Sequence, residues 1–136
     1  MLGVIVCTHS NLAFGLKDSI EMITGPQQDF DVVGFQEGED MLSLSERLKK
    51  IAAGYEERKQ RYVLLVDLFG ATPFNAGAAG LATYDTSIIT GVNLPLLLEL
   101  ITGRSSMNDY DQLLENALKS AQSNMQMIKM REMFQK

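Results

Sequence analysis

The sequence predicts an α/β fold, a three-layer α/β/α open sheet with four parallel strands. Short apolar runs rich in β-branched residues alternate four times with stretches of helical periodicity, and this alternation is typical of parallel sheets. The 136 residues are 46% hydrophobic and 21% charged, which suits one domain over residues 1–136. Right-handed crossovers leave few topologies, and we expect the doubly wound strand order 2-1-3-4.

Two strand–helix units are predicted in the first half of the chain. Residues 2–7 are almost purely apolar, like a strand buried on both faces, and Asn11 is expected to cap the helix that runs to Gly25. Residues 32–35 form the second apolar run, and Asp40 is expected to cap the second helix. The apolar face of the first helix comprises Leu12, Leu16, Ile20 and Ile23, and that of the second comprises Met41, Leu44, Leu48, Ile51 and Tyr55.

The other two units follow residues 62–66, the clearest buried strand, which ends on Asp67. Thr72 is expected to cap a helix that runs from Pro73 to about residue 82. The fourth strand is expected at residues 87–89, followed by a helix over residues 95–103. A last helix is capped by Asp109 or Asp111, with Leu114, Leu118 and Ala121 on its apolar face. Residues 124–130 alternate like a short strand, although a helix fits them equally well.

Composition excludes several classes of function. Twelve basic and seventeen acidic residues give a formal charge of −5, which disfavours nucleic acids as partners. One cysteine, Cys7, and one histidine form neither a disulfide nor the usual zinc site, and the common nucleotide-binding loops are absent, so we expect no metal and no cofactor. The N-terminal apolar run lacks a basic start and is too short for a signal peptide, so we expect a cytoplasmic protein.

Two chemically capable side chains follow predicted strands: His9 after the first and Asp67 after the third. Functional residues of open α/β sheets gather at the carboxyl ends of the strands, so these two side chains face each other if their strands are neighbours. The carboxylate would then accept a hydrogen bond from one ring nitrogen and leave the other free as nucleophile or base. The structural alternative is a surface histidine beside a strand-terminal aspartate.

Helix starts beside this pair suggest an anion site. Free backbone N–H groups are expected after Asn11 and at the helix that Thr72 begins, where they could hold a phosphoryl group. Gly70 would let the backbone approach such a group closely. Helix initiation alone also explains Thr72 and Pro73, so this signal is not specific by itself.

Three segments together resemble the mannose-type enzyme IIA domains of the bacterial phosphoenolpyruvate-dependent sugar phosphotransferase system. They are residues 4–16, residues 66–75 and residues 91–95. The resemblance implies that His9 is phosphorylated, that Asp67 orients it, and that Thr72 lies near the phosphoryl group. It also implies HPr as donor, enzyme IIB as acceptor, indirect association with the membrane subunits IIC and IID, and a late antiparallel strand exchanged in a homodimer.

Two residues depart from the family pattern. Ser10 and Ala71 stand where many relatives have glycine, and each adds a Cβ near the expected phosphoryl site. If either residue needs a positive φ, the substitution costs free energy. Ser10 is also a candidate hydrogen-bond donor to the phosphoryl oxygens.

Two other functions fit the same residues. One is a regulatory module in which phosphorylation of His9 alters the affinity for a partner. The other is the phosphocarrier subunit of a dihydroxyacetone kinase, although residues 67–73 fit the sugar-transport branch better.

Overall fold

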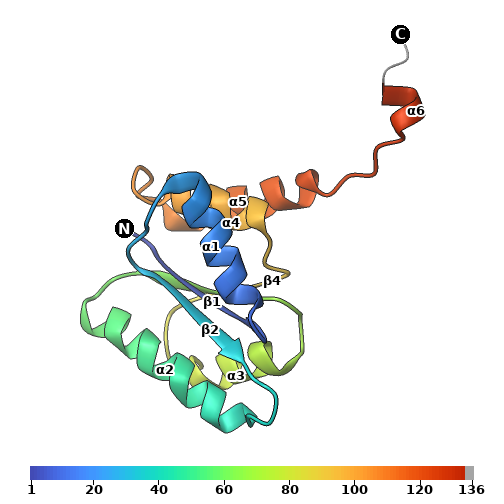
Figure 1. Ribbon diagram of the computed structural model, residues 1–136. Helices are drawn as coiled ribbons and strands as arrows, with labels where there is room; N and C mark the ends of the chain where they lie inside the picture. The colour runs from blue at the N-terminus through green and yellow to red at the C-terminus, as the bar shows by residue number, and fades with distance from the viewer. Residues whose placement is uncertain (134–136) are drawn as a thin grey trace.

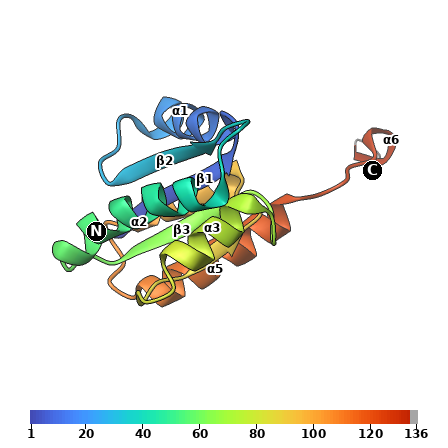
Figure 2. The same ribbon diagram turned by 90° about the horizontal axis from the view of Figure 1, so that it is seen from below.

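Four parallel strands form one sheet in the order β2-β1-β3-β4, as the sequence predicts. The computed structural model describes residues 1–133. The strands are β1 (Gly3–His9), β2 (Phe30–Phe35), β3 (Tyr62–Val66) and β4 (Ile88–Thr90). The helices are α1 (Leu12–Thr24), α2 (Met41–Glu57), α3 (Thr72–Gly80), α4 (Leu94–Gly103), α5 (Tyr110–Asn124) and α6 (Met130–Met133). Helices cover both faces of the sheet, so the molecule has the expected three layers (Figures 1 and 2).

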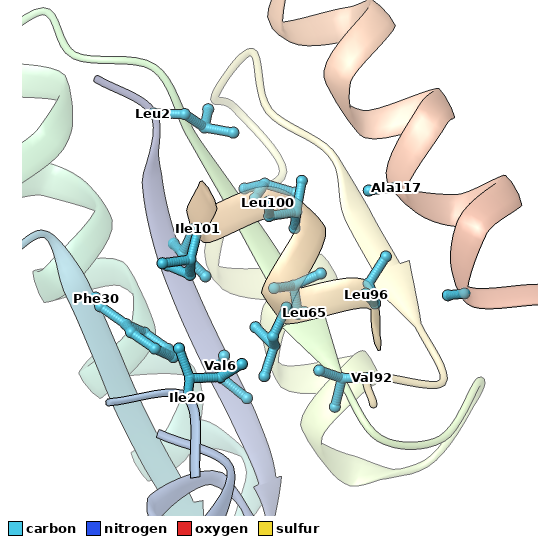
Figure 3. Packing of buried hydrophobic residues seen from close by; sticks show 14 of the residues in the cluster. Leu2, Val6, Ile20, Phe30, Leu65, Val92, Leu96, Leu100, Ile101 and Ala117 are labelled. Atoms are coloured by element: carbon cyan, nitrogen blue, oxygen red, sulfur yellow. The ribbon is translucent and has the colours of Figure 1, made fainter. Parts of the chain in front are cut away.

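Alternating residues of the central strands supply two separate cores. Val6 and Leu65 belong to the core under α1, α4 and α5, which Figure 3 shows from close by. Cys7 and Leu64 belong to the opposite core, under α2 and α3. Because β1 and β3 are buried on both faces, their sequences are almost continuously apolar.

The helix caps agree with the sequence in part. Asp40 and Asp109 cap α2 and α5 by accepting hydrogen bonds from backbone N–H groups, as predicted. Asn11 occupies the cap position of α1, as predicted, but its side chain makes no capping bond. Thr8 Oγ1 accepts from the Ala13 N–H at 2.7 Å instead. The prediction for Thr72 is wrong: it is the first residue of α3, with Ala71 at the cap position.

The buried faces of two helices are rotated from the predicted ones. In α1 the small Ala13 lies against the sheet together with Ile20, while Leu12 and Ile23 are exposed. A small residue where the helix contacts the sheet lets the two approach closely. Periodicity alone does not show which residue lies at that contact. In α5 the buried residues are Leu113, Ala117 and Ala121, whereas the predicted Leu118 is partly exposed; Met41 of α2 is exposed as well.

The chain after α5 leads away from the sheet, as Figures 1 and 2 both show. Residues 125–129 have no regular structure and precede the short α6. The strand predicted at residues 124–130 therefore does not form in the single chain, because this segment extends away from the sheet and does not reach either of its edges (Figure 1). None of the described helices is long and apolar enough to cross a bilayer.

Arg104, at the end of α4, is 1% exposed and joins three distant parts of the chain. Its guanidinium donates to the carbonyl oxygens of Leu2 and Asp29 at 3.2 and 2.8 Å. It also donates to the Gln28 carbonyl and to Gln27 Oε1. The loop before β2 and the N-terminal segment are thus held by one buried cation at the end of the sheet opposite His9.

We expect Arg104→Met to lower the free energy of unfolding by about 2–4 kcal/mol, because buried carbonyl oxygens lose their donors. Urea denaturation measures this change. Arg61→Met is the matched control, since Arg61 forms an exposed ion pair with Asp111 and should cost less than about 1 kcal/mol. Equal losses for the two variants would contradict the assigned role of Arg104.

Candidate functional site

His9 and Asp67 meet at the carboxyl end of the sheet. β1 and β3 are neighbours, and their pairing ends at Cys7 and Val66, so Asp67 comes one residue beyond the last pair. Asp67 Oδ2 lies 2.8 Å from His9 Nδ1 and also accepts the His9 backbone N–H at 2.9 Å. Asp67 Oδ1 accepts the Leu68 N–H at 3.0 Å. Three hydrogen bonds therefore fix the carboxylate against the ring.

The charge of Asp67 settles which ring nitrogen carries the proton. Burial by itself would raise the pKa of the Asp67 carboxyl, but the hydrogen bonds from the His9 backbone and ring outweigh it and lower the pKa below its usual value. An ionised carboxylate accepts only, so His9 Nδ1 donates. Nε2 is then the unprotonated nitrogen of the neutral ring, and the His9 side chain is 44% exposed.

Ser10 has a left-handed backbone conformation, with a φ of +51°. Its N–H donates to the Phe35 carbonyl at 2.8 Å. Its own carbonyl oxygen lies 2.3 Å from where a Cβ on the buried Gly34 would be, so residue 34 must be glycine for this turn to close. The concern about Ser10 is thus confirmed. The same free-energy cost does not arise at Ala71, because its φ of −85° suits any residue.

The hollow beside the histidine ring is lined by side chains that the sequence analysis did not single out. His9 and Ser10 share a hollow of about 400 Å³ with Phe35, Gln36 and Glu37. The Phe35 ring meets the His9 ring edge to face, with centroids 5.9 Å apart. These three residues lie at the carboxyl end of β2 or just after it. The predicted strand order 2-1-3-4 places this strand beside the one that carries His9, so it could have identified these residues as neighbours of His9.

The second candidate anion site lies at the start of α3, which packs against β1. Gly70 has a φ of +77°, and its missing Cβ faces open space, so glycine serves the turn rather than a close protein contact. Asn75 Nδ2 donates to the Gly70 carbonyl at 3.1 Å and stabilises this turn. Pro73 has no N–H and the Asn75 N–H donates to the Ala71 carbonyl, so in this first turn the N–H groups of Thr72 and Phe74 lack partners within the helix. The half-buried Thr72 adds a hydroxyl there.

Asn11 lies between β1 and α1, two residues after His9. Its side chain is exposed and makes no capping bond. His9 contacts Asp67 directly, and Ser10 follows His9 in the chain. Asn11 and Thr72 lie on the two segments that flank this pair. Within residues 1–133, no three His, Cys, Asp or Glu side chains form a group that could hold a metal ion.

Cys7 lies two residues before His9 but is fully buried. Burial, together with the negative charge of Asp67, raises the pKa of the Cys7 thiol to about 12. At pH 8 only about one molecule in 10⁴ then carries a thiolate. We expect iodoacetamide to alkylate the native protein about 10³-fold more slowly than the urea-unfolded chain, as followed by mass spectrometry. Similar rates in both states would contradict the assignment of Cys7 as an inert packing residue.

Comparisons with known proteins give one consistent result. The chain matches the family model EIIA-man, described as the PTS system fructose IIA component, over residues 3–118. The PTS system fructose-specific EIIA component of Bacillus subtilis (strain 168) is 34% identical over 127 residues, which cover 93% of this chain and 86% of that relative. The PTS system sorbose-specific EIIA component of Klebsiella pneumoniae is 34% identical over 113 residues, covering 82% and 81%.

The fold agrees as well. The crystal structure of the phosphotransferase system component EIIA from Streptococcus agalactiae has a TM-score of 0.85 and 25% sequence identity, and the match covers 93% of this chain and 97% of that one. The resemblance drawn from the sequence is therefore confirmed. With the family model matching most of its length, this chain belongs to the EIIA-man family of sugar phosphotransferase system components.

Proposed function

We propose that this chain is a phosphohistidine carrier that accepts a phosphoryl group from phospho-HPr on His9 and passes it to enzyme IIB. The observation that supports this most directly is the 2.8 Å contact between His9 Nδ1 and Asp67 Oδ2, which in the neutral ring places the proton on Nδ1 and the free lone pair on Nε2. A neutral imidazole held in one tautomer is a nucleophile that needs no further base.

The transfer step follows from this geometry. Nε2 of His9 attacks phosphorus, the P–N bond to the donor histidine breaks, and the donor keeps the electron pair of that bond. The His9 ring becomes cationic as the new P–N bond forms, and the ionised Asp67 carboxylate stabilises that charge. Candidate donors to the phosphoryl oxygens are Ser10, Asn11, Thr72 and the backbone N–H groups near Gly70 and Ala71.

Intact-mass spectrometry tests the proposal. The protein is mixed with phosphoenolpyruvate, enzyme I and HPr, and we expect the addition of one phosphoryl group that is labile to acid and stable to base. Subsequent addition of enzyme IIB should remove it. No modification by active HPr would overturn the proposal, and a phosphoryl group that no enzyme IIB accepts would favour the regulatory function instead.

Two variants of Ser10 separate the role of its hydroxyl from that of its backbone. Ser10→Ala removes the hydroxyl but keeps a Cβ at positive φ, whereas Ser10→Gly removes both. If the hydroxyl binds the phosphoryl group, both variants should shorten the half-life of phosphorylated His9 by about threefold to tenfold, the loss expected for one hydrogen bond. Half-lives that match the wild type in both variants would remove Ser10 from the phosphoryl site.

Ser10→Gly should also raise the free energy of unfolding by about 1 kcal/mol relative to Ser10→Ala, because glycine adopts positive φ freely. Thermal unfolding of the two variants side by side measures this difference.

A homodimer completes the proposal. The outer edge of β4 carries two hollows on the side of α5, of about 390 and 250 Å³, and Leu118 lines both of them. Residues 125–129 of a second copy have the alternating apolar pattern that could pair along this edge. In this proposal the dimer works in the cytoplasm and reaches the membrane subunits IIC and IID indirectly, through enzyme IIB.

A further inference from the structure

Four of the eight methionines of the chain lie within nine residues at its C-terminal end. They are Met125, Met127, Met130 and Met133, and all four are exposed. Met125 and Met127 are the most open of them, at 84% and 86%. So much apolar surface on an extended segment is unusual unless something covers it in the working protein.

The two hollows beside β4 share Leu118 and together form a partly apolar groove that could receive this segment. The smaller hollow has a mixed lining: Leu96, Leu118, Ala121 and Met125 are apolar, while Thr90, Asn93 and Gln122 are polar. Its apolar part reaches the point where the segment leaves α5. Alternate residues of an extended chain face the same side, so Met125 and Met127 would point together into the groove of a second copy, with Gln126 facing away. This step rests on the homodimer proposed above.

We propose that Met125 and Met127 are an oxidative modification site that controls this pairing. A peroxide transfers one oxygen atom to the thioether sulfur of each methionine, so that sulfur loses two electrons and the peroxide is reduced to water or an alcohol. The product, methionine sulfoxide, is polar and disrupts methionine-rich interfaces, and sulfoxide reductases reverse the change. Oxidation therefore releases the segment from its partner, and reduction restores the pair.

Oxidation of Met125 and Met127 should be faster in the monomer than in the dimer. In the monomer both thioethers are open to solvent, whereas in the exchanged dimer they would be covered. Met22 of α1 is 90% exposed, lies outside the segment and serves as an internal reference. Peroxide should oxidise Met125 and Met127 as fast as Met22 in dilute samples, and at least tenfold more slowly than Met22 in concentrated samples.

Sedimentation velocity with peptide mass spectrometry tests the proposal on the full chain. After treatment with hydrogen peroxide, we expect the dimer dissociation constant to rise at least tenfold and to recover with methionine sulfoxide reductases. The double variant Met125→Leu/Met127→Leu keeps the apolar surface but has no sulfur, so its dimer should resist peroxide. Met22→Leu, the matched control, should behave as the wild type does.

The outcomes separate the two proposals. A protein that is monomeric before oxidation would overturn the homodimer and the switch together, while phosphorylation of His9 in the same samples would still report on the carrier function. A dimer that survives full oxidation of Met125 and Met127 would overturn the switch alone. A double leucine variant that loses its dimer as readily as the wild type would also overturn the assignment to these two residues.

Discussion

Replacing His9 with alanine is expected to abolish phosphoryl acceptance, with no detectable mass increase after incubation with phospho-HPr. The chain contains one histidine, so no second imidazole can take over the reaction. The half-exposed ring contributes little packing but donates to the ionised Asp67 carboxylate, so the free energy of unfolding should fall by about 1–3 kcal/mol. A folded but unreactive variant is therefore the expected result.

The stability of any residual product to acid and base provides the control for this experiment. A phosphoryl group on Ser10 or Asp67 would differ from phosphohistidine, because a phosphoserine survives acid and an acyl phosphate is lost in base. Phosphorylation of the His9→Ala variant at the wild-type rate would show that the acceptor lies elsewhere in the chain.

Asp67→Ala is expected to slow phosphoryl transfer by about 10² or more, because the ring loses the partner that fixes its tautomer and stabilises its cationic form. Rapid-quench measurement with phospho-HPr gives the rate. Asp67→Asn is the matched variant, since its amide oxygen can still accept a hydrogen bond but carries no charge. A wild-type rate in Asp67→Ala would remove Asp67 from the mechanism.

The effect of pH on stability checks the same contact independently. The pKa of the folded Asp67 carboxyl is lowered from 3.8, so its contribution to the free energy of unfolding is complete above that value and is lost as the pH falls through the folded pKa. The difference in unfolding free energy between wild type and Asp67→Ala should therefore be largest near neutral pH and shrink below about pH 4. A difference that does not change with pH would mean that the carboxylate has no electrostatic role in the folded state.

The sheet and the contact between His9 and Asp67 were predictable because each depends on a local pattern. The continuous apolar runs of β1 and β3 predict strands that are buried on both faces. Neighbouring parallel strands end at the same edge of the sheet, so the residues that follow them lie close together. His9 and Asp67 meet for this reason alone. The cap of α1 was not predictable in the same way, because Thr8 and Asn11 are both able to accept from backbone N–H groups and only the turn at Ser10 decides between them.

Other features depend on contacts between distant residues. The buried seam of α1 contains Ala13 rather than Leu12 because of how closely the helix approaches the sheet, which periodicity does not encode. Residues 125–129 alternate like a strand but lead away from the sheet, so they pair with none of its edges in one copy of the chain (Figure 1). In the sequence, Arg104 looks like an ordinary surface residue after a helix. In the structure it is buried and donates to the carbonyl groups of two residues that lie 75 and 102 positions earlier in the chain.

The contact between Ser10 and Gly34 has a consequence for how the site tolerates sequence variation. The Ser10 carbonyl occupies the space that a side chain on residue 34 would need, so any substitution there would push the turn that carries His9. Residue 34 lies on β2 and has no side chain, yet a mutational scan should find it nearly as constrained as His9. Ser10 is limited in another way: its side chain is exposed, but its positive φ favours glycine and asparagine over bulkier residues. The turn beside His9 therefore limits variation at two positions, at residue 34 through lack of space and at residue 10 through backbone conformation.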